Sequence, residues 1–300
     1  MKLSRFLLIL AYFTFVLSCG KKESQINPEE HAAEVEAWYQ DRVNSVKSEE
    51  GWLNLIGLHW LDAGETTFGT GAGSRFRLES QGFPDSIGVF FLEEGKVYFT
   101  PQTDSIFLGE NELKEKVKIF DVETQEFEKL SFKSLRWNII KRADAYGVRL
   151  RDLETAAVTQ FEGIKRYPID LEWRLEAKFI PYSPIREIPI TNVLGQTTPN
   201  PSPGYLEFQK DGITYKIDAL DAEDELYLII ADNTSGGETY GGGRYMYVKK
   251  PVSGDIVILD FNKAYNPPCV FTPHATCPLP PRQNMLDLAI TAGEKTFGEH

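Results

Sequence analysis

The 300-residue sequence predicts a mainly β protein with two packed antiparallel β sandwiches or barrels, preceded by one amphipathic helix. Apolar residues recur at helical spacing only near the N-terminus. After residue 51 they alternate with polar residues, and turn residues interrupt this alternation at short intervals. The length favours two domains, because a single hydrophobic core stops growing at roughly 250–300 residues.

The composition excludes several classes of protein. A content of 42% hydrophobic and 12% aromatic residues is too high for a disordered chain. The 32 basic and 44 acidic residues give a net charge of -12, so no cationic surface and no nucleic-acid partner are expected. A polytopic membrane protein is not expected either, because only residues 6–17 approach the length that a bilayer requires.

Residues 1–18 have the pattern of a secretory signal. Lys2 and Arg5 precede the apolar run 6–17, which at about 18 Å is shorter than the roughly 30 Å hydrocarbon core. Cys19 follows directly, as in a bacterial lipobox. We therefore expect lipid on Cys19, the membrane as a partner through that lipid, and a location in the cell envelope outside the cytoplasm, at the periplasmic face or the cell surface. An ordinary signal peptide or an uncleaved anchor is the alternative.

Residues 19–50 are expected to form a polar tether followed by one helix. Asn27 can cap this helix, Pro28 suits its first turn and Gly51 can end it. The apolar stripe indicates packing rather than chemistry. It consists of Val35, Trp38, Arg42 or Val43, and Val46.

The rest of the chain is divided into a first β domain, residues 51–165, and a second β domain, residues 166–300. A glycine-containing turn and a proline at 164–168 interrupt the pattern and suggest this boundary. The first domain is expected to hold hairpins at 87–100 and 130–150. The second should hold a hairpin at 205–217, with Asp-Gly in its turn, and strands at 171–179, 225–231, 245–249 and 255–261.

Common catalytic and nucleotide-binding motifs are absent from the sequence. It contains neither the Gly-x-Ser-x-Gly spacing of a hydrolase nor a Walker loop. The glycine-dense residues 236–243 precede a predicted strand rather than a helix, which favours a hairpin turn over a phosphate site. Arg244 follows these glycines, so a contact with a carboxylate or phosphate stays open.

The two late cysteines favour a disulfide. Cys269 and Cys277 lie eight residues apart, and an oxidising envelope promotes pairing at such spacing. Two buried free thiols are the alternative. A zinc site would need His274 with both sulfurs and a further ligand or water, but the disulfide competes for the sulfurs. No metal and no other cofactor is therefore expected.

Residues 260–281 are the strongest candidate for a binding site. Six prolines exclude a central strand, and a loop of this length is uncommon unless it is functional or disordered. Proline rings and a disulfide would leave this loop little entropy to lose on binding. A plug over an open sheet edge is the alternative. The loop would present Asp260, Asn262, Tyr265, Asn266, Thr272 and His274.

A second candidate is His59 beside Trp60, near a glycine-rich turn. These two residues could form the rim of a pocket. A histidine that is buried and hydrogen-bonded in the core is the alternative.

Residues 57–61, 239–245 and 260–281 resemble the bacterial family catalogued as domain of unknown function 1684. The similarity covers nearly the whole chain after the helix, and its most specific part runs from Asn-Pro-Pro-Cys to Thr-Cys-Pro-Leu-Pro-Pro. The resemblance implies family membership and brings no established activity with it. The family commonly has tyrosine at the position of His274, so the resemblance implies no obligatory catalytic role for this residue.

These features favour a non-catalytic envelope lipoprotein that binds a polar ligand such as a glycan or cell-wall fragment, because tyrosine and tryptophan faces suit sugars. The alternative is a carboxylate-dependent hydrolase with Asp260 as general base, Arg244 and Tyr240 holding the anionic or leaving group, and His59 assisting. A structural subunit of an envelope complex is a third hypothesis. The expected ligand-binding residues are Tyr240, Arg244, Asp260, Asn262, Tyr265, Asn266, His274, His59 and Trp60.

Overall fold

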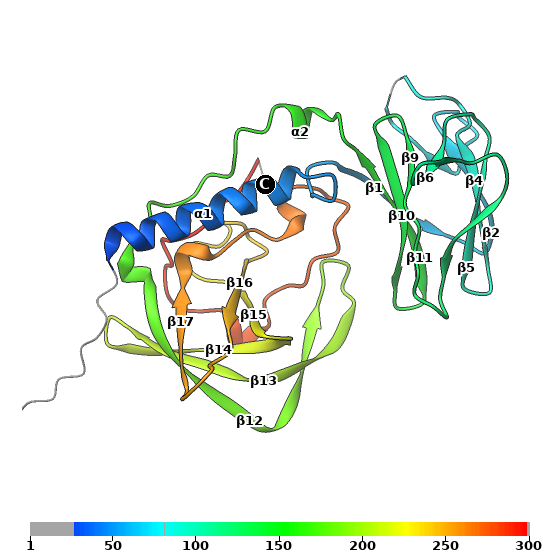
Figure 1. The fold of residues 1–300 in the computed structure, drawn as a ribbon. Coiled ribbons are helices and arrows are strands. Elements are labelled where there is room, and N and C mark those ends of the chain that lie inside the picture. The colour runs from blue at the N-terminus through cyan, green and yellow to red at the C-terminus, as the bar shows by residue number, and fades with distance from the viewer. Residues whose placement is uncertain (1–26, 81, 299–300) are drawn as a thin grey trace, which may run out of the picture.

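The computed structural model describes residues 27–80 and 82–298. The expected signal and Cys19 lie outside these residues. The chain forms two β regions, and the long helix α1 runs along the larger one, which contains a strongly curved sheet (Figure 1). The mainly β fold with one long early helix is therefore confirmed. None of the helices in the described ranges has the length and apolar composition that a membrane span requires.

The first β region contains a six-stranded sheet, ordered β1-β11-β10-β9-β6-β7, and a five-stranded sheet, ordered β3-β2-β4-β5-β8. Aromatic side chains of both sheets, with Phe68, Phe99 and Trp137 at the centre, fill one hydrophobic core. The strands are β1 (Leu55–Leu61), β2 (Gly64–Gly69), β3 (Phe76–Arg77), β4 (Gly88–Glu93), β5 (Lys96–Pro101), β6 (Phe107–Leu108), β7 (Asn111–Glu112), β8 (Val117–Asp121), β9 (Leu130–Phe132), β10 (Leu135–Arg142) and β11 (Ala145–Asp152).

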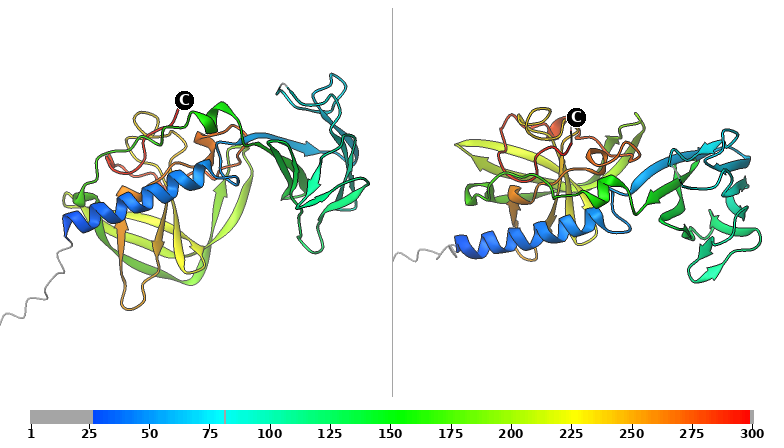
Figure 2. Two further views of the ribbon diagram at one scale, coloured as in Figure 1. Left: turned by 45° about the horizontal axis from the view of Figure 1, so that its top comes forward. Right: turned by 90° about the horizontal axis from the view of Figure 1, so that it is seen from above.

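The second β region is built on one six-stranded antiparallel sheet, ordered β16-β15-β14-β13-β12-β17. The sheet curls until its two outer strands approach each other, which gives a nearly closed barrel (Figure 2). Its interior is packed with aliphatic and aromatic side chains such as Leu206, Phe208 and Phe261. The strands are β12 (Arg174–Thr191), β13 (Thr197–Lys210), β14 (Ile213–Ala222), β15 (Glu225–Ile230), β16 (Arg244–Lys249) and β17 (Ile256–Asp260).

Strands β12 and β13 extend well beyond the strands expected at 171–179 and 205–209. In the extension, residues 186–191 pair with residues 197–202 although both segments contain prolines. Prolines fit here because this part of the sheet is a two-stranded ribbon, in which each strand has an edge that needs no N–H donor. The first residues of the expected strand form the short helix η1 (Leu171–Trp173) instead.

Helix α1 (Pro28–Lys47) begins as expected, since the side chain of Asn27 accepts a hydrogen bond from the Glu29 amide at 2.9 Å. It ends at Lys47 with Ser48 as its cap, so the expectation that Gly51 ends it is wrong. Its buried residues are His31, Val35 and Val46. His31 lies 2.8 Å from Asp260, and Tyr39 donates to the Ile164 carbonyl at 2.7 Å, so the helix packs on the second β region.

The other short helices are α2 (Ala156–Thr159), η2 (Phe261–Lys263), η3 (Pro268–Val270) and η4 (Arg282–Asn284). The C-terminal segment then returns across the barrel. Gly293 in this segment has a φ of +77°, and a Cβ atom there would lie 2.4 Å from the Ala264 carbonyl oxygen. The close approach of two backbones therefore requires glycine at this position.

We expect Gly293→Ala to lower the free energy of unfolding by about 3–5 kcal/mol, because a strained φ and a steric overlap act together. Gly254→Ala is the matched control: Gly254 also has a positive φ, of +74°, but no atom lies within 4 Å of the added Cβ. Its expected cost is about 1–2 kcal/mol. Urea denaturation measures both values, and equal losses would contradict the close-packing argument.

Candidate functional site

The proline-rich loop is folded tightly onto the body of the protein. Cys269 and Cys277 form the expected disulfide, with their Cα atoms 6.1 Å apart. The Asn266 amide donates to the Glu294 carboxylate at 2.7 Å, and the Thr272 hydroxyl donates to the Leu55 carbonyl at 2.8 Å. The loop therefore contacts both β regions, and it leaves no pair of free thiols for a zinc site.

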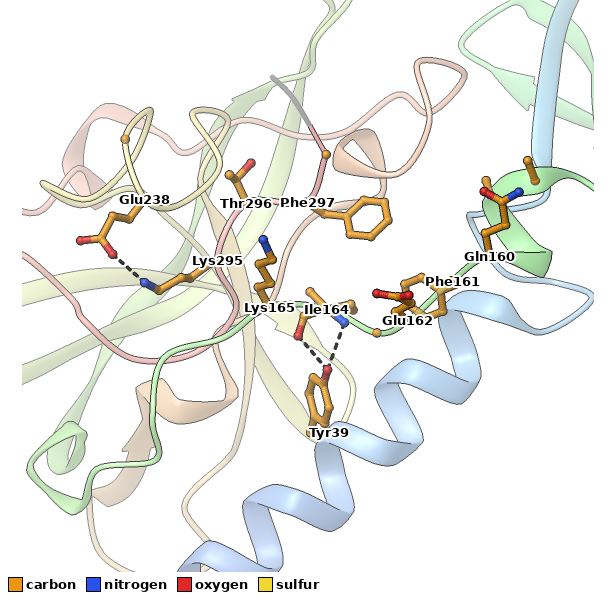
Figure 3. Close-up of a pocket in the computed structure, with 15 residues that line it drawn as sticks. Tyr39, Gln160, Phe161, Glu162, Ile164, Lys165, Glu238, Lys295, Thr296 and Phe297 are labelled. Carbon is orange, nitrogen blue, oxygen red and sulfur yellow. Dashed lines mark hydrogen bonds and ion pairs between the residues drawn. The ribbon is translucent and has the colours of Figure 1, made fainter.

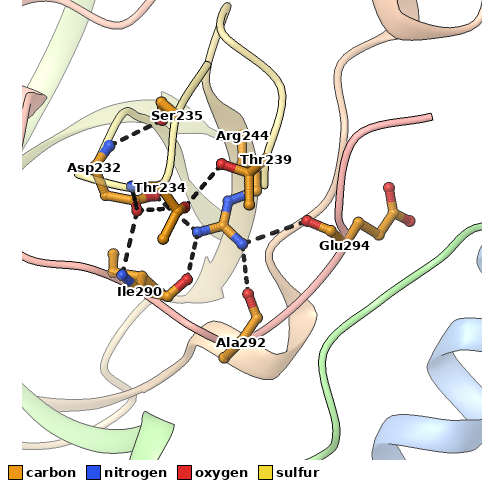
Figure 4. A network of polar contacts seen from close by, with 8 residues as sticks. All are labelled: Asp232, Thr234, Ser235, Thr239, Arg244, Ile290, Ala292 and Glu294. Carbon is orange, nitrogen blue, oxygen red and sulfur yellow. Dashed lines mark hydrogen bonds and ion pairs between the residues drawn. The ribbon is translucent and has the colours of Figure 1, made fainter. Parts of the chain in front are cut away.

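Arg244 lies in the interior rather than at a surface. Its side chain is 0% exposed and donates to Asp232 at 2.8 Å and to the Ile290 carbonyl at 3.0 Å. It also donates to the carbonyls of Ala292 and Glu294 (Figure 4). The guanidinium thus holds the C-terminal segment against the barrel.

Asp260 and Asn262 hold three elements together. The Asp260 carboxylate lies 2.8 Å from His31 of helix α1 and accepts from the Asn262 side chain at 2.8 Å. Asn262 in turn donates to the Asp170 carbonyl at 2.8 Å and accepts from the Asp170 amide at 2.9 Å. Asp260 also borders an open groove of about 700 Å³ beside the seam between β16 and β17.

The buried Asn266 donates from its side chain to the Lys295 carbonyl at 2.7 Å.

His59 and His274 share a separate pocket of about 420 Å³ next to β3. The His59 ring stacks on Phe76 with a centroid distance of 4.7 Å. Burial lowers the pKa of both histidines, and for His59 the charge of Arg75 contributes to the lowering. Both imidazoles are therefore neutral at pH 7. Trp60 packs on the other side of the strand, against Gly147.

The structure does not bring the residues of the hydrolase hypothesis together. Arg244 is buried beside Asp232, Asp260 is paired with His31, and His59 lies in the first β region. Tyr240, a half-buried residue, packs over Gly242. General acid–base catalysis needs its groups within hydrogen-bond reach of one reacting atom, and this arrangement does not provide that.

A different pocket, here named the tyrosine pocket, lies between the two β regions and has a volume of about 320 Å³. One wall comes from the proline-rich loop, which contributes Tyr265. The other walls come from helix α1, from the segment before β1, from β10 and β11, and from the outer face of β15 and β16. The lining residues are Arg42, Trp52, Arg142, Arg149, Tyr227, Tyr245, Tyr247, Tyr265, Pro268, Ala275, Thr276, Cys277 and Pro278.

Strand register gathers the tyrosines. Tyr227 of β15 lies directly opposite Tyr247 of β16, and their rings stack at 4.9 Å. Tyr245 lies two residues before Tyr247 and points to the same outer face, because side chains alternate along a strand. It pairs by main-chain hydrogen bonds with Tyr265, which stacks on Tyr247 at 6.3 Å. The residues between them on each strand, Leu228 and Met246, fill the barrel interior.

The tyrosine hydroxyls of this pocket are uncharged hydrogen-bonding groups. Burial raises the pKa of Tyr227, Tyr245 and Tyr265 well above the ordinary value, so these phenols keep their protons at physiological pH. The Tyr245 hydroxyl donates to the Pro278 carbonyl at 2.6 Å, which ties the loop to the sheet. The pocket therefore offers aromatic faces with polar edges.

Arginines complete the pocket. The Arg42 guanidinium lies 4.7 Å from the centroid of the Tyr265 ring and donates from Nε to Glu294 at 3.2 Å and from Nη2 to the Asn266 carbonyl at 2.8 Å. Arg149 lies 5.5 Å from the centroid of Trp52. Burial, with the nearby charges of Arg151 and Arg142, lowers the pKa of Arg149 to about 10, so it is still charged at pH 7.

A larger pocket of about 900 Å³ lies near the C-terminal segment (Figure 3). Its polar groups mostly bind one another: Lys295 pairs with Glu238 at 2.7 Å, and the Tyr39 hydroxyl binds the Ile164 backbone. None of the expected site residues lines it. Within the residues that the structure describes, no group of three or more histidine, cysteine or acidic side chains is placed to hold a metal ion.

Sequence reasoning found Tyr265 and Cys277 of the tyrosine pocket and missed most of the others. Arg42 was assigned to an apolar stripe, and nothing in the sequence of the strand that contains Arg149 indicated a binding site. The Tyr245-x-Tyr247 spacing was the available signal, because it places two tyrosines on one strand face.

We expect Asp232→Asn to lower the free energy of unfolding by about 3–5 kcal/mol, because it leaves the fully buried Arg244 without its counter-charge. Asp255→Asn is the matched control. It breaks an ion pair with Lys178 in which both side chains are about half exposed, and about 1 kcal/mol or less is expected. Chemical denaturation compares the variants, and a small loss for Asp232→Asn would show that Arg244 does not depend on this pair.

Comparison with known proteins supports the family resemblance. Residues 159–295 match the family model described as "Protein of unknown function (DUF1684)", so the block at 57–61 lies outside the matched residues. The solution NMR structure of an uncharacterized protein from Haloarcula marismortui is 32% identical to this chain, with 47% of this chain and 80% of that chain covered and a TM-score of 0.40. The search of curated proteins gave no match. The family resemblance indicated by the proline-rich loop and the segment before it is thus confirmed over residues 159–295, which match a family of proteins of unknown function.

Proposed function

We propose that this protein is a cell-envelope lipoprotein that binds a polar ligand, a glycan or cell-wall fragment, in the tyrosine pocket. The observation that carries the proposal is the gathering of Trp52 and four tyrosines around one pocket. Sugars present apolar C–H faces and polar edges, and aromatic rings with a hydroxyl or N–H at one end complement both. The raised pKa values of the buried phenols keep these hydroxyls able to donate as well as accept.

The size and the rigidity of the pocket support the same proposal. A volume of about 320 Å³ is at the lower end of the range for small-molecule sites, roughly 300–1,000 Å³, and suits a sugar-sized unit. The loop wall is held by the disulfide, by the Tyr245–Pro278 hydrogen bond and by the Asn266–Glu294 hydrogen bond. A wall that is already ordered loses little entropy on binding.

We expect Tyr247→Ala to weaken glycan binding about three- to tenfold, because stacking on an aromatic ring contributes about 0.5–1.5 kcal/mol. Tyr247 is 51% exposed, so its removal leaves the barrel core intact. Tyr98→Ala on β5 is the matched control, because Tyr98 does not line the pocket. Binding to a panel of glycans and peptidoglycan fragments is measured by thermal shift and then by calorimetry. No response to any member of the panel would contradict the proposed function.

The lipid anchor is tested separately. We expect cells grown with a clickable fatty-acid analogue to label the protein. Cys19→Ala should lose the label and move to the soluble fraction, because Cys19 is the proposed attachment site of the lipid. Cys269→Ser is the control, since Cys269 is occupied by the disulfide. Retained labelling in Cys19→Ala would show that another residue carries the lipid.

A further inference from the structure

The tyrosine pocket carries more positive charge than a neutral sugar requires. Three of its lining residues are arginines, Arg42, Arg142 and Arg149, and none is aspartate or glutamate. The whole chain has 44 acidic and 32 basic residues, so this lining departs from the general composition. Partly buried guanidinium groups favour a counter-charge, and one supplied by a ligand would satisfy them.

Arg149 is the pocket arginine whose hydrogen-bonding capacity is unused. Its Nε atom is buried and has no partner among the described residues. Within those residues, the contact made by its guanidinium is with the face of Trp52, and no acceptor binds it. The negative charge of Glu50 opposes the lowering of the Arg149 pKa without a hydrogen bond to Arg149. The Glu50 carboxylate instead accepts a hydrogen bond from Lys129 at 2.6 Å.

The other two arginines are placed differently. Arg42 is fixed by Glu294 and by the Asn266 carbonyl, and it covers the Tyr265 ring. Arg142 lies at the exposed end of β10, where it donates to the neighbouring Lys141 carbonyl at 3.1 Å. Arg42 therefore shapes the wall and Arg142 adds charge at the rim. Arg149 has the free donors that recognition of an anion needs.

We propose that the ligand of the tyrosine pocket is an acidic sugar, and that Arg149 binds its carboxylate with two parallel hydrogen bonds. This inference rests on the proposed function and names the ligand class of the same site. The planar guanidinium fork matches the geometry of a carboxylate, and the Arg149 guanidinium lies over the Trp52 ring. The tyrosine faces then pack on the sugar ring beside the carboxylate.

The test compares matched acidic and neutral sugars on the unchanged protein. N-acetylmuramic acid differs from N-acetylglucosamine by a lactyl ether with a carboxylate, and glucuronic acid differs from glucose by its carboxylate. Calorimetry should give at least tenfold tighter binding for the acid of at least one pair. Arg149→Gln should abolish this preference while the affinity for the neutral sugar stays within about twofold. Arg282→Gln, which removes an exposed charge outside the pocket, should keep the preference.

Each outcome separates this inference from the proposed function. Equal affinity for acid and neutral sugar, with binding still weakened by Tyr247→Ala, overturns the inference and leaves the proposed function standing. Equal loss in Arg149→Gln and Arg282→Gln also overturns it, because net charge then explains the preference. No binding of any sugar overturns the proposed function and the inference with it. Where Arg149→Gln does not fold, Arg149→Lys keeps the charge without the fork, and an unchanged preference in that variant overturns the bidentate contact.

Discussion

The shape of the tyrosine pocket depends on the buried carboxylate of Glu294. This side chain, 1% exposed, accepts from Arg42 of helix α1 at 3.2 Å and from the Asn266 amide of the proline-rich loop at 2.7 Å. Burial raises the pKa of Glu294, while the charge of Arg42 opposes this rise. A buried carboxylate without its partners is costly, so the helix, the loop and the C-terminal segment are held in one arrangement.

The consequences of this contact extend to the pocket surface. Arg42, once fixed, lies over the Tyr265 ring, and Tyr265 in turn pairs with Tyr245 of the barrel wall. Arg244 supports the same segment from the other side, since it binds the carbonyls of residues 290, 292 and 294. The pocket is thus assembled from distant parts of the chain by two buried charge clusters. Such an assembly keeps the aromatic faces in place before any ligand arrives.

The sequence predicted those features that depend on neighbouring residues. The start of helix α1 follows from Asn27 and Pro28, the hairpin of β13 and β14 follows from Asp211-Gly212, and the disulfide follows from the spacing of two cysteines. The predicted end of the helix was wrong. Gly51 lies where the chain passes close to the Val46 carbonyl, and this close approach, not a helix cap, is what requires glycine there.

The features that depend on long-range pairing were not predictable in this way. His31 reads as a polar residue on a helix surface, yet it is buried against Asp260, 229 positions away. Arg244 follows a flexible glycine segment and reads as a surface cation, yet its charge is compensated by Asp232 across the turn. The spacing of apolar residues shows which face of a helix or strand is buried, but it does not show which polar side chain contacts that face.

The proline-rich loop makes the buried polar contacts of a plug, and it also borders the tyrosine pocket. Its polar side chains at Asp260, Asn262, Asn266 and Thr272 are buried and bind the body of the protein, as a plug requires. Its rings and backbone from Tyr265 to Pro278 instead border the tyrosine pocket. Because these four polar side chains are already used, the loop supplies the pocket with its shape and with the ring of Tyr265. In the proposed site, selectivity for a polar ligand would come from the tyrosine hydroxyls and from the guanidinium of Arg149.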